Sequence, residues 1–429
     1  MPYRFTKRRL SATVYYIFAA LLIGVVGSTV VQWLIPTWQQ GLWSSSWTVA
    51  TVHTMILGFM LTTVFGVMFQ VIPIAFQAPP IPRHVLYWHL PLHIVAVSGM
   101  IAGFLLHTYF VTGIFGTVLL ISTLMFLWMA AKSYRKARNK TAVHQHLIFP
   151  FVSLAIVMLF GIWMAFALPG TGFHLYLTHI FFGVFGFWVT LVLVVSYKFI
   201  PMFTLSHGYK SSLPVAIRVF VIGIALYATA SLLNLSYHIA QSAGLVIALL
   251  GLIHFARDMV AIVRARKRKR ILYSIRMALT ATTLLFVGSI GLFAAAGFSW
   301  FPLVLPSAYL LVMGGFTLLI LAYVQKIVPF LWYEYRFSHH KDRKQAPLID
   351  EMMPSVMTRT GITLYMVSVL AGWIELILYG VFRYTVVLTA LQTLLCVVSA
   401  SGWLLILFSA LKVLTIGGPR IDEPEEGAD

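Results

Sequence analysis

The chain has 429 residues, of which 60% are hydrophobic and only 10% are charged. Soluble proteins of average composition carry roughly 25% charged residues, so this composition excludes an ordinary soluble domain. The net charge of +19 would suggest nucleic-acid binding in a soluble protein. Here the basic residues lie between long apolar runs and indicate membrane orientation instead, and we expect no nucleic-acid partner. The single cysteine, Cys396, excludes a disulfide framework.

Apolar runs of about 20 residues predict helices that cross a lipid bilayer. The sequence contains twelve such runs. We therefore predict an all-α polytopic membrane protein with one membrane domain over residues 1–429. The predicted spans are 14–36, 49–76, 84–109, 111–132, 146–168, 173–203, 214–235, 237–263, 273–297, 302–332, 355–379 and 384–413.

The positive charges mark one side of these spans. Groups of Lys and Arg precede the first span and follow the fourth, eighth and tenth, whereas the opposite loops carry only Arg383. The positive-inside rule then places both termini in the cytoplasm, with an acidic cytoplasmic tail at 414–429. We expect a multi-pass protein of a prokaryotic plasma membrane.

A glycine lies 15 residues before a proline in the second, sixth and tenth spans, and the three pairs lie 128 residues apart. The pairs are Gly58 and Pro73, Gly186 and Pro201, and Gly314 and Pro329. A glycine allows close helix contact, and a proline ends or kinks a helix. We predict three pseudo-repeated four-helix units, at about 14–140, 141–270 and 271–413, each with its second helix at the centre.

Five histidines fall in the outer half of the predicted spans: His53, His107, His174, His179 and His238. Polar groups inside a membrane are functional candidates, and imidazole is a common metal and haem ligand. Each histidine also has a structural interpretation: His53 and His179 as packing groups, His174 as a helix cap, and the other two as interfacial residues. His174 and His179 share a helical face only loosely, so metal binding requires a partner from another helix.

Three further features lie elsewhere in the spans. His89 and His93 are four residues apart on one helix, a spacing that suits a shared site for metal ligation or quinone contact. Glu375 lies in the eleventh span, where it is either a packing group or a proton carrier. Lys198 and Lys326 lie at equivalent positions of the repeat, where we expect their side chains to reach the cytoplasmic headgroups.

This arrangement of twelve helices in three units, with a histidine on the second helix and others on the sixth, resembles subunit I of the haem–copper oxidase superfamily. The string from His53 to Phe59, followed by Gly66 and Pro73, is also similar to a pattern of the NnrS-type membrane proteins. Those proteins are short relatives associated with haem, copper and nitric-oxide stress. The resemblance implies that His53 is an axial ligand of a b-type haem. It implies that His179, with His174, lies at the position of a copper ligand.

The sequence departs from the oxidase pattern in two ways. The tenth span contains no histidine, and Tyr309 stands at its outer end. The first carboxylate in the chain is Asp258, so the acidic relays of a proton pump are missing from most of the spans. We expect neither a complete oxygen-reducing centre nor proton pumping.

The sequence therefore predicts one b-type haem or a histidine-bound metal such as copper. The bound haem or metal would serve in electron transfer, or in binding or sensing nitric oxide or oxygen. If the protein is an enzyme, we expect a membrane oxidoreductase. A quinol or a redox protein is the expected partner. One alternative is a cofactor-free transporter, partner subunit or assembly factor that retains the scaffold. Another is a quinol-interacting subunit that uses His89 and His93.

Overall fold

The computed structural model describes residues 10–137, 140–167, 173–233, 238–337, 346–378 and 386–417. Within these ranges it contains twelve helical spans that are long and apolar enough to cross a membrane, and no β-strand. The predicted all-α membrane fold is confirmed, and the helix boundaries inside the described ranges agree with the predicted ones to within four residues. The predicted boundaries at 168, 235, 237, 379 and 384 lie outside the described residues.

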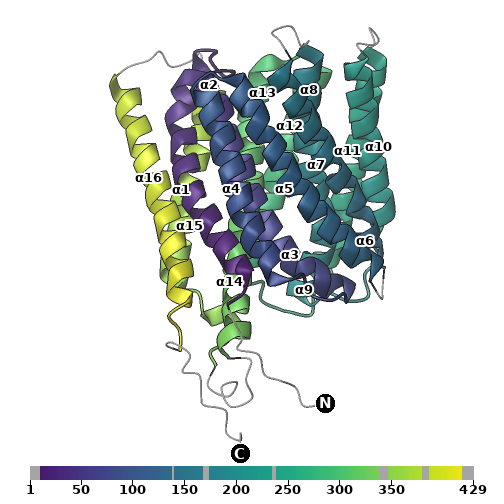
Figure 1. Cartoon of the computed structure of the whole chain (residues 1–429), viewed down its shortest axis with the longest axis vertical. Coiled ribbons are helices and arrows are strands. Elements are labelled where there is room, and N and C mark those ends of the chain that lie inside the picture. Colours follow the sequence, from purple (N-terminus) through teal and green to yellow (C-terminus); the bar gives the residue numbers. More distant parts are fainter. Residues whose placement is uncertain are drawn as a thin grey trace, which may run out of the picture.

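The helices follow one another in an up-and-down order (Figure 1). The first six spans comprise α1 (Ala12–Gln39), α2 (Ser46–His53) with η1 (Thr54–Leu61) and α3 (Thr62–Phe76), α4 (Arg83–Leu105), α5 (Tyr109–Arg135), α6 (Ala142–His146) with α7 (Ile148–Phe166), and α8 (Phe173–Phe181) with η2 (Phe182–Val189) and α9 (Thr190–Thr204). The other six comprise α10 (Leu213–Leu232), α11 (His238–Arg264), α12 (Tyr273–Gly297), η3 (Phe301–Leu303) with α13 (Val304–Tyr309), η4 (Leu310–Thr317) and α14 (Leu318–Arg336), α15 (Ser355–Ile377), and α16 (Val386–Val413). A short helix, η6 (Ile349–Glu351), precedes α15.

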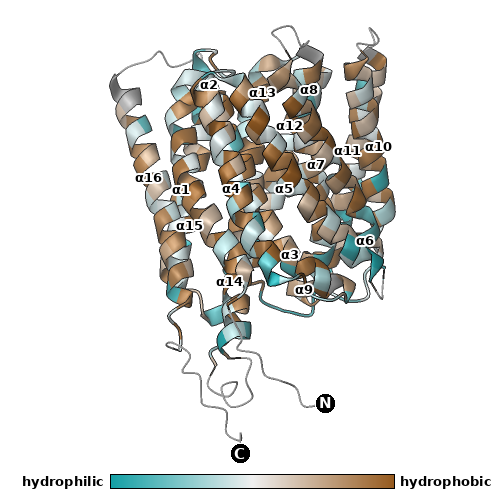
Figure 2. Cartoon of the chain, in the orientation of Figure 1, coloured by the Kyte–Doolittle hydropathy of each residue, from teal (hydrophilic) through white to brown (hydrophobic). Residues whose placement is uncertain are grey.

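The two ends of the bundle differ in charge. We call the lower end in Figure 1, where α5 and α11 finish, the basic end, because Lys132, Arg135 and Arg264 lie there. The helix surfaces are apolar, and hydrophilic residues gather near α6 and below α14 at the basic end (Figure 2). Within the described residues, the connections at the opposite end contain no Lys or Arg. This asymmetry suits a bundle that spans a bilayer.

Three spans contain a π-helix at the same place. The segments η1, η2 and η4 begin at residues 54, 182 and 310, which are 128 residues apart, and each is 8 residues long. In these three spans 67–72% of the most apolar stretch is buried, against 28–50% in the other nine. The second, sixth and tenth spans are therefore the most buried spans in the described part of the chain.

The repeated glycine is the fifth residue of each π-helix, and each packs against the span that precedes it. A Cβ atom on Gly58 would lie 2.9 Å from a methyl of Ile23 in α1, and the equivalent contacts of Gly186 and Gly314 are to α7 and α12. A π-turn shifts the backbone hydrogen bonds by one residue, which leaves carbonyl groups in need of other donors. Side chains supply these donors at the carbonyls of Leu57, Phe185 and Met313, which are again 128 residues apart.

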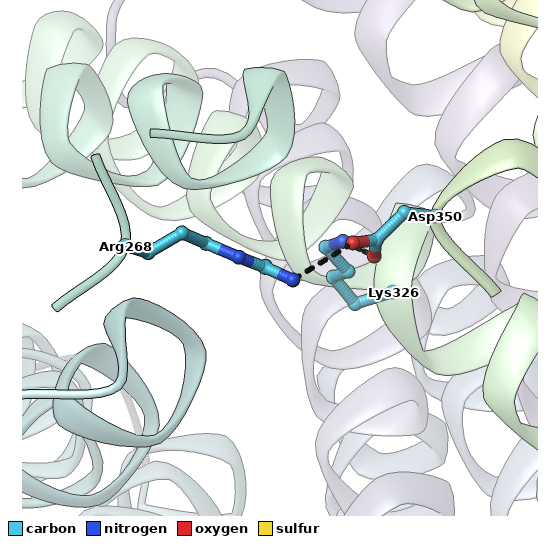
Figure 3. A network of polar contacts seen from close by, with 3 residues as sticks. All are labelled: Arg268, Lys326 and Asp350. Atoms are coloured by element: carbon cyan, nitrogen blue, oxygen red, sulfur yellow. Dashed lines mark hydrogen bonds and ion pairs between the residues drawn. The ribbon is translucent and has the colours of Figure 1, made fainter. Parts of the chain in front are cut away.

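The short helix η6 closes part of the basic end. Its Asp350 carboxylate accepts a hydrogen bond from the ammonium group of Lys326 and lies 3.4 Å from Arg268 Nη2 (Figure 3). The side chain of Lys326 is only 9% exposed. The sequence-based expectation for Lys326 is therefore wrong: its ammonium group does not reach the headgroups, because a carboxylate from the next loop neutralises it inside the protein.

Replacement of Asp350 with asparagine is expected to destabilise the protein by about 2 kcal/mol, because it leaves the Lys326 charge buried without a countercharge. The more exposed Arg268 contributes little, since solvent screens it. Thermal unfolding of the purified protein in detergent measures the effect. Glu351→Gln is the matched control, because Glu351 is an exposed carboxylate in the same turn. Equal stability of the two variants would show that the ion pair does not hold this loop.

Candidate functional site

His53 is the last residue of α2, directly before the first π-helix. Its Nδ1–H donates to the Val49 carbonyl oxygen one turn earlier, at 2.7 Å. The ring packs against Phe104 of α4, with 5.0 Å between the ring centroids. Since the Nδ1 bond fixes the ring and its tautomer, the lone pair of Nε2 remains available for a ligand.

His179 lies in α8, three residues before the second π-helix. Its Nδ1–H donates to the Val157 carbonyl oxygen of α7 at 2.9 Å. Gly161, one turn further along α7, makes room for the ring: a Cβ atom there would lie 3.1 Å from His179 Cε1. His179 is therefore held in the same way as His53: its Nδ1–H donates to a backbone carbonyl, and its Nε2 is available for a ligand.

The structure brings these two histidines together, although they come from different helices. Their ring centroids are 6.4 Å apart, and their planes are inclined by 26°. Metal–nitrogen bonds of about 2 Å place two imidazole rings on opposite sides of one ion with centroids roughly 6 Å apart. Neither Nε2 atom has a hydrogen-bond partner among the described residues. The separation and the free nitrogens both suit two ligands of a single metal.

The number of protein donor atoms limits which metal ion or metal-containing cofactor the two histidines could bind. Among the described residues, no set of three or more His, Cys, Asp and Glu side chains is grouped as a metal site. Two imidazoles alone underfill a tetrahedral zinc site, which takes four ligands. A haem brings four nitrogens of its own and requires only axial ligands from the protein. The donor set of His53 and His179 therefore fits a haem iron, and also a copper ion of low coordination number.

His89 and His93 form a different kind of site. Both are fully buried on α4. His89 is bonded at Nδ1 to the Tyr16 hydroxyl group (2.9 Å) and at Nε2 to the Ser122 carbonyl oxygen (3.1 Å). His93 Nε2 donates to the Leu57 carbonyl oxygen at 3.2 Å, the carbonyl freed by the π-turn. These contacts tie α4 to α1, η1 and α5, and they occupy three of the four ring nitrogens.

The remaining predicted histidines are His107, His174 and His238. His107 follows α4 in a left-handed conformation, with φ +55°, and its Nδ1 is 3.0 Å from the hydroxyl oxygen of Ser46 at the surface. His174 lies in the first turn of α8 and His238 begins α11. The side chains of these two residues lie outside the described part of the structure.

Tyr309 is buried at the end of α13, directly before the third π-helix. It lies 256 residues after His53, or two repeat intervals, and so takes the equivalent place in the tenth span. Its hydroxyl oxygen accepts a hydrogen bond from Gln32 Nε2 at 2.7 Å. Sequence reasoning selected Tyr309 but missed Gln32, although a glutamine inside an apolar span is itself a signal.

In comparisons with known proteins, no family model and no curated protein matches the chain.

Proposed function

We propose that this chain is a haem–copper-oxidase-like membrane protein that holds one b-type haem between His53 and His179. The observation that carries the proposal is the pair of imidazole rings 6.4 Å apart, each held by a backbone carbonyl at Nδ1. A copper ion bound by the Nε2 atoms of the same two histidines is the alternative occupant of this site.

The proposal includes three four-helix units with their termini in the cytoplasm. The π-helices at 54, 182 and 310 support the units, since each interrupts the second helix of one unit. The basic loops support the orientation. The histidine pair then lies in the outer half of the membrane, between the first and second units.

Bound haem would supply a one-electron redox couple to this site. A haem held by both His53 and His179 would favour electron transfer over binding of nitric oxide or oxygen. A haem held by only one of the two histidines would instead favour binding of these gases. His53 packs on Phe104, and His179 packs against the backbone of Gly161.

The protein side chains set the properties of such a site. The hydrogen bonds from Nδ1 to the carbonyls of Val49 and Val157 make both imidazoles better electron donors and fix their rotation. The surroundings supply no positive charge, since no Lys or Arg lies in the connections at this end in the described ranges. Electrons would come from or go to a quinol or a redox protein.

The absorption spectrum of the detergent-purified protein, together with its iron and copper content, tests the proposal. A Soret band and about one iron per chain are expected for one haem. Copper without a Soret band would assign the histidine pair to copper. If the protein contains neither metal and shows no Soret band, the proposal fails, and a cofactor-free scaffold becomes the better interpretation.

A further inference from the structure

A second polar cluster lies inside the bundle, between α1, α13, α15 and α16. Its members are Gln32 and Gln39 of α1, Tyr309 of α13, Glu375 of α15 and Gln392 of α16. We call these five residues the glutamine cluster. Helices α1, α15 and α16 lie side by side at the left of Figure 1. Glu375 is in the last turn of α15, so the cluster extends inward from the end of the bundle opposite the basic end.

Hydrogen bonds connect the members of the glutamine cluster. Gln32 Nε2 donates to the Tyr309 hydroxyl oxygen at 2.7 Å. Gln392 Nε2 donates to the backbone carbonyl of Gln32. Gln39 Nε2 donates to the Glu375 backbone carbonyl at 3.2 Å and to its Oε1 at 3.4 Å. Because carbonyl oxygens only accept, these bonds fix which way the amides of Gln39 and Gln392 point.

Three oxygen atoms of the cluster are buried and have no donor. They are Oε1 of Gln32, Oε1 of Gln392 and Oε2 of Glu375. The side chains of Gln32 and Gln392 are 0% and 5% exposed. A buried acceptor without a donor is unfavourable, so three of them in one cluster indicate that a donor or a cation binds there.

The absence of a side chain at Gly372 lets the Gln32 amide and the Tyr309 hydroxyl group lie against α15. A Cβ atom on Gly372 would lie 2.9 Å from Gln32 Oε1 and 2.7 Å from the Tyr309 hydroxyl oxygen. Gly372 is one helical turn before Glu375, on the same side of α15. The Gln32 amide and the Glu375 carboxylate therefore lie along the same side of α15, and Gln392 is bonded to the backbone of Gln32.

No protein cation balances Glu375 in the described part of the chain, where the ion pairs are those of Asp350 at the basic end. A carboxylate within a membrane span normally has a partner. One negative charge balances a monovalent cation, and carboxylate and amide oxygens are ligands that hard cations prefer. A single proton on Glu375 would satisfy one oxygen, whereas a metal cation contacts several at once.

We propose that the glutamine cluster binds a sodium ion through the side-chain oxygens of Gln32, Glu375 and Gln392. Tyr309 in the third repeat occupies the position that His53 occupies in the first repeat. The proposed ligands are therefore oxygen atoms in the third repeat, where the first repeat offers a histidine nitrogen. Glu375, half-buried at the end of α15, provides the entry from the membrane surface. The site is independent of the histidine pair.

Binding of radioactive sodium to the full-length purified protein tests this proposal, with choline as the inert cation. We expect saturable binding of about one ion per chain, and a weakening by about tenfold or more in Glu375→Gln, because the variant lacks the only charged ligand. Glu334→Gln is the matched control, since Glu334 is an exposed carboxylate at the basic end, and it should bind sodium normally.

Gly372→Ala provides a second variant that keeps every ligand. Its added methyl group would separate Gln32 Oε1 from Tyr309, and sodium binding should weaken there also. The proposal is wrong if the wild-type protein does not bind sodium, if Glu375→Gln binds it unchanged, or if thermal stability responds to pH but not to sodium. His53→Ala should leave sodium binding intact, so a failure here is distinguishable from a failure of the haem proposal.

Discussion

His53→Ala is expected to remove the Soret band of the purified protein while the protein remains folded. Loss of a residue that only orients a metal ligand lowers metal affinity by about 10–100-fold, and loss of the ligand itself should exceed that. The fold should tolerate the change, because the His53 hydrogen bond lies within its own helix. His179→Ala should give the same spectrum. The measurement is absorbance per chain together with thermal unfolding.

His107→Ala is the control for both variants, because His107 lies at the surface near the same end of the bundle. It should retain the full Soret band. If His53→Ala and His179→Ala also retain it, the haem has other ligands. If only one of them loses it, the two rings do not share one iron.

Gly161→Val is expected to reduce haem content by about tenfold without removing a ligand. The first atom of any side chain at this position would lie 3.1 Å from His179 Cε1, and the branched side chain of valine would extend further into the ring. The imidazole must then rotate and lose its hydrogen bond to the Val157 carbonyl. Haem per chain and thermal stability are measured together, since overpacking costs about 1–3 kcal/mol.

Gly116→Val on α5 is the matched control. A Cβ atom on Gly116 would meet only Ile162, at 3.4 Å, so this variant adds the same bulk next to α7 without touching a histidine. It should keep its haem. Equal haem content in the Gly161 and Gly116 variants would contradict the claim that the position of the His179 ring determines haem binding.

The spans could be predicted well from the sequence, because a bilayer requires long apolar helices and the sequence displays them directly. The π-helices could not, since an apolar run looks the same whether its turns are α or π. The repeated glycines Gly58, Gly186 and Gly314 were the available signal: each is the fifth residue of a π-helix.

The two histidines could be selected from the sequence, but their contact could not. His53 and His179 are 126 residues apart on different helices, so no local spacing reports their distance. Gly161 gave no signal either, because its importance depends on which helix packs against it. The glutamine cluster was missed because hydropathy arguments concentrate on charges, and Gln32 and Gln392 are neutral residues within apolar runs.

Electron paramagnetic resonance of the oxidised protein at low temperature tests the central claim most directly, because it reports both the presence of haem iron and its axial ligands. The account predicts a low-spin ferric signal from iron with two imidazole ligands, integrating to about one iron per chain and absent from His53→Ala and His179→Ala. A protein without iron, or a signal that survives in both variants, would contradict it.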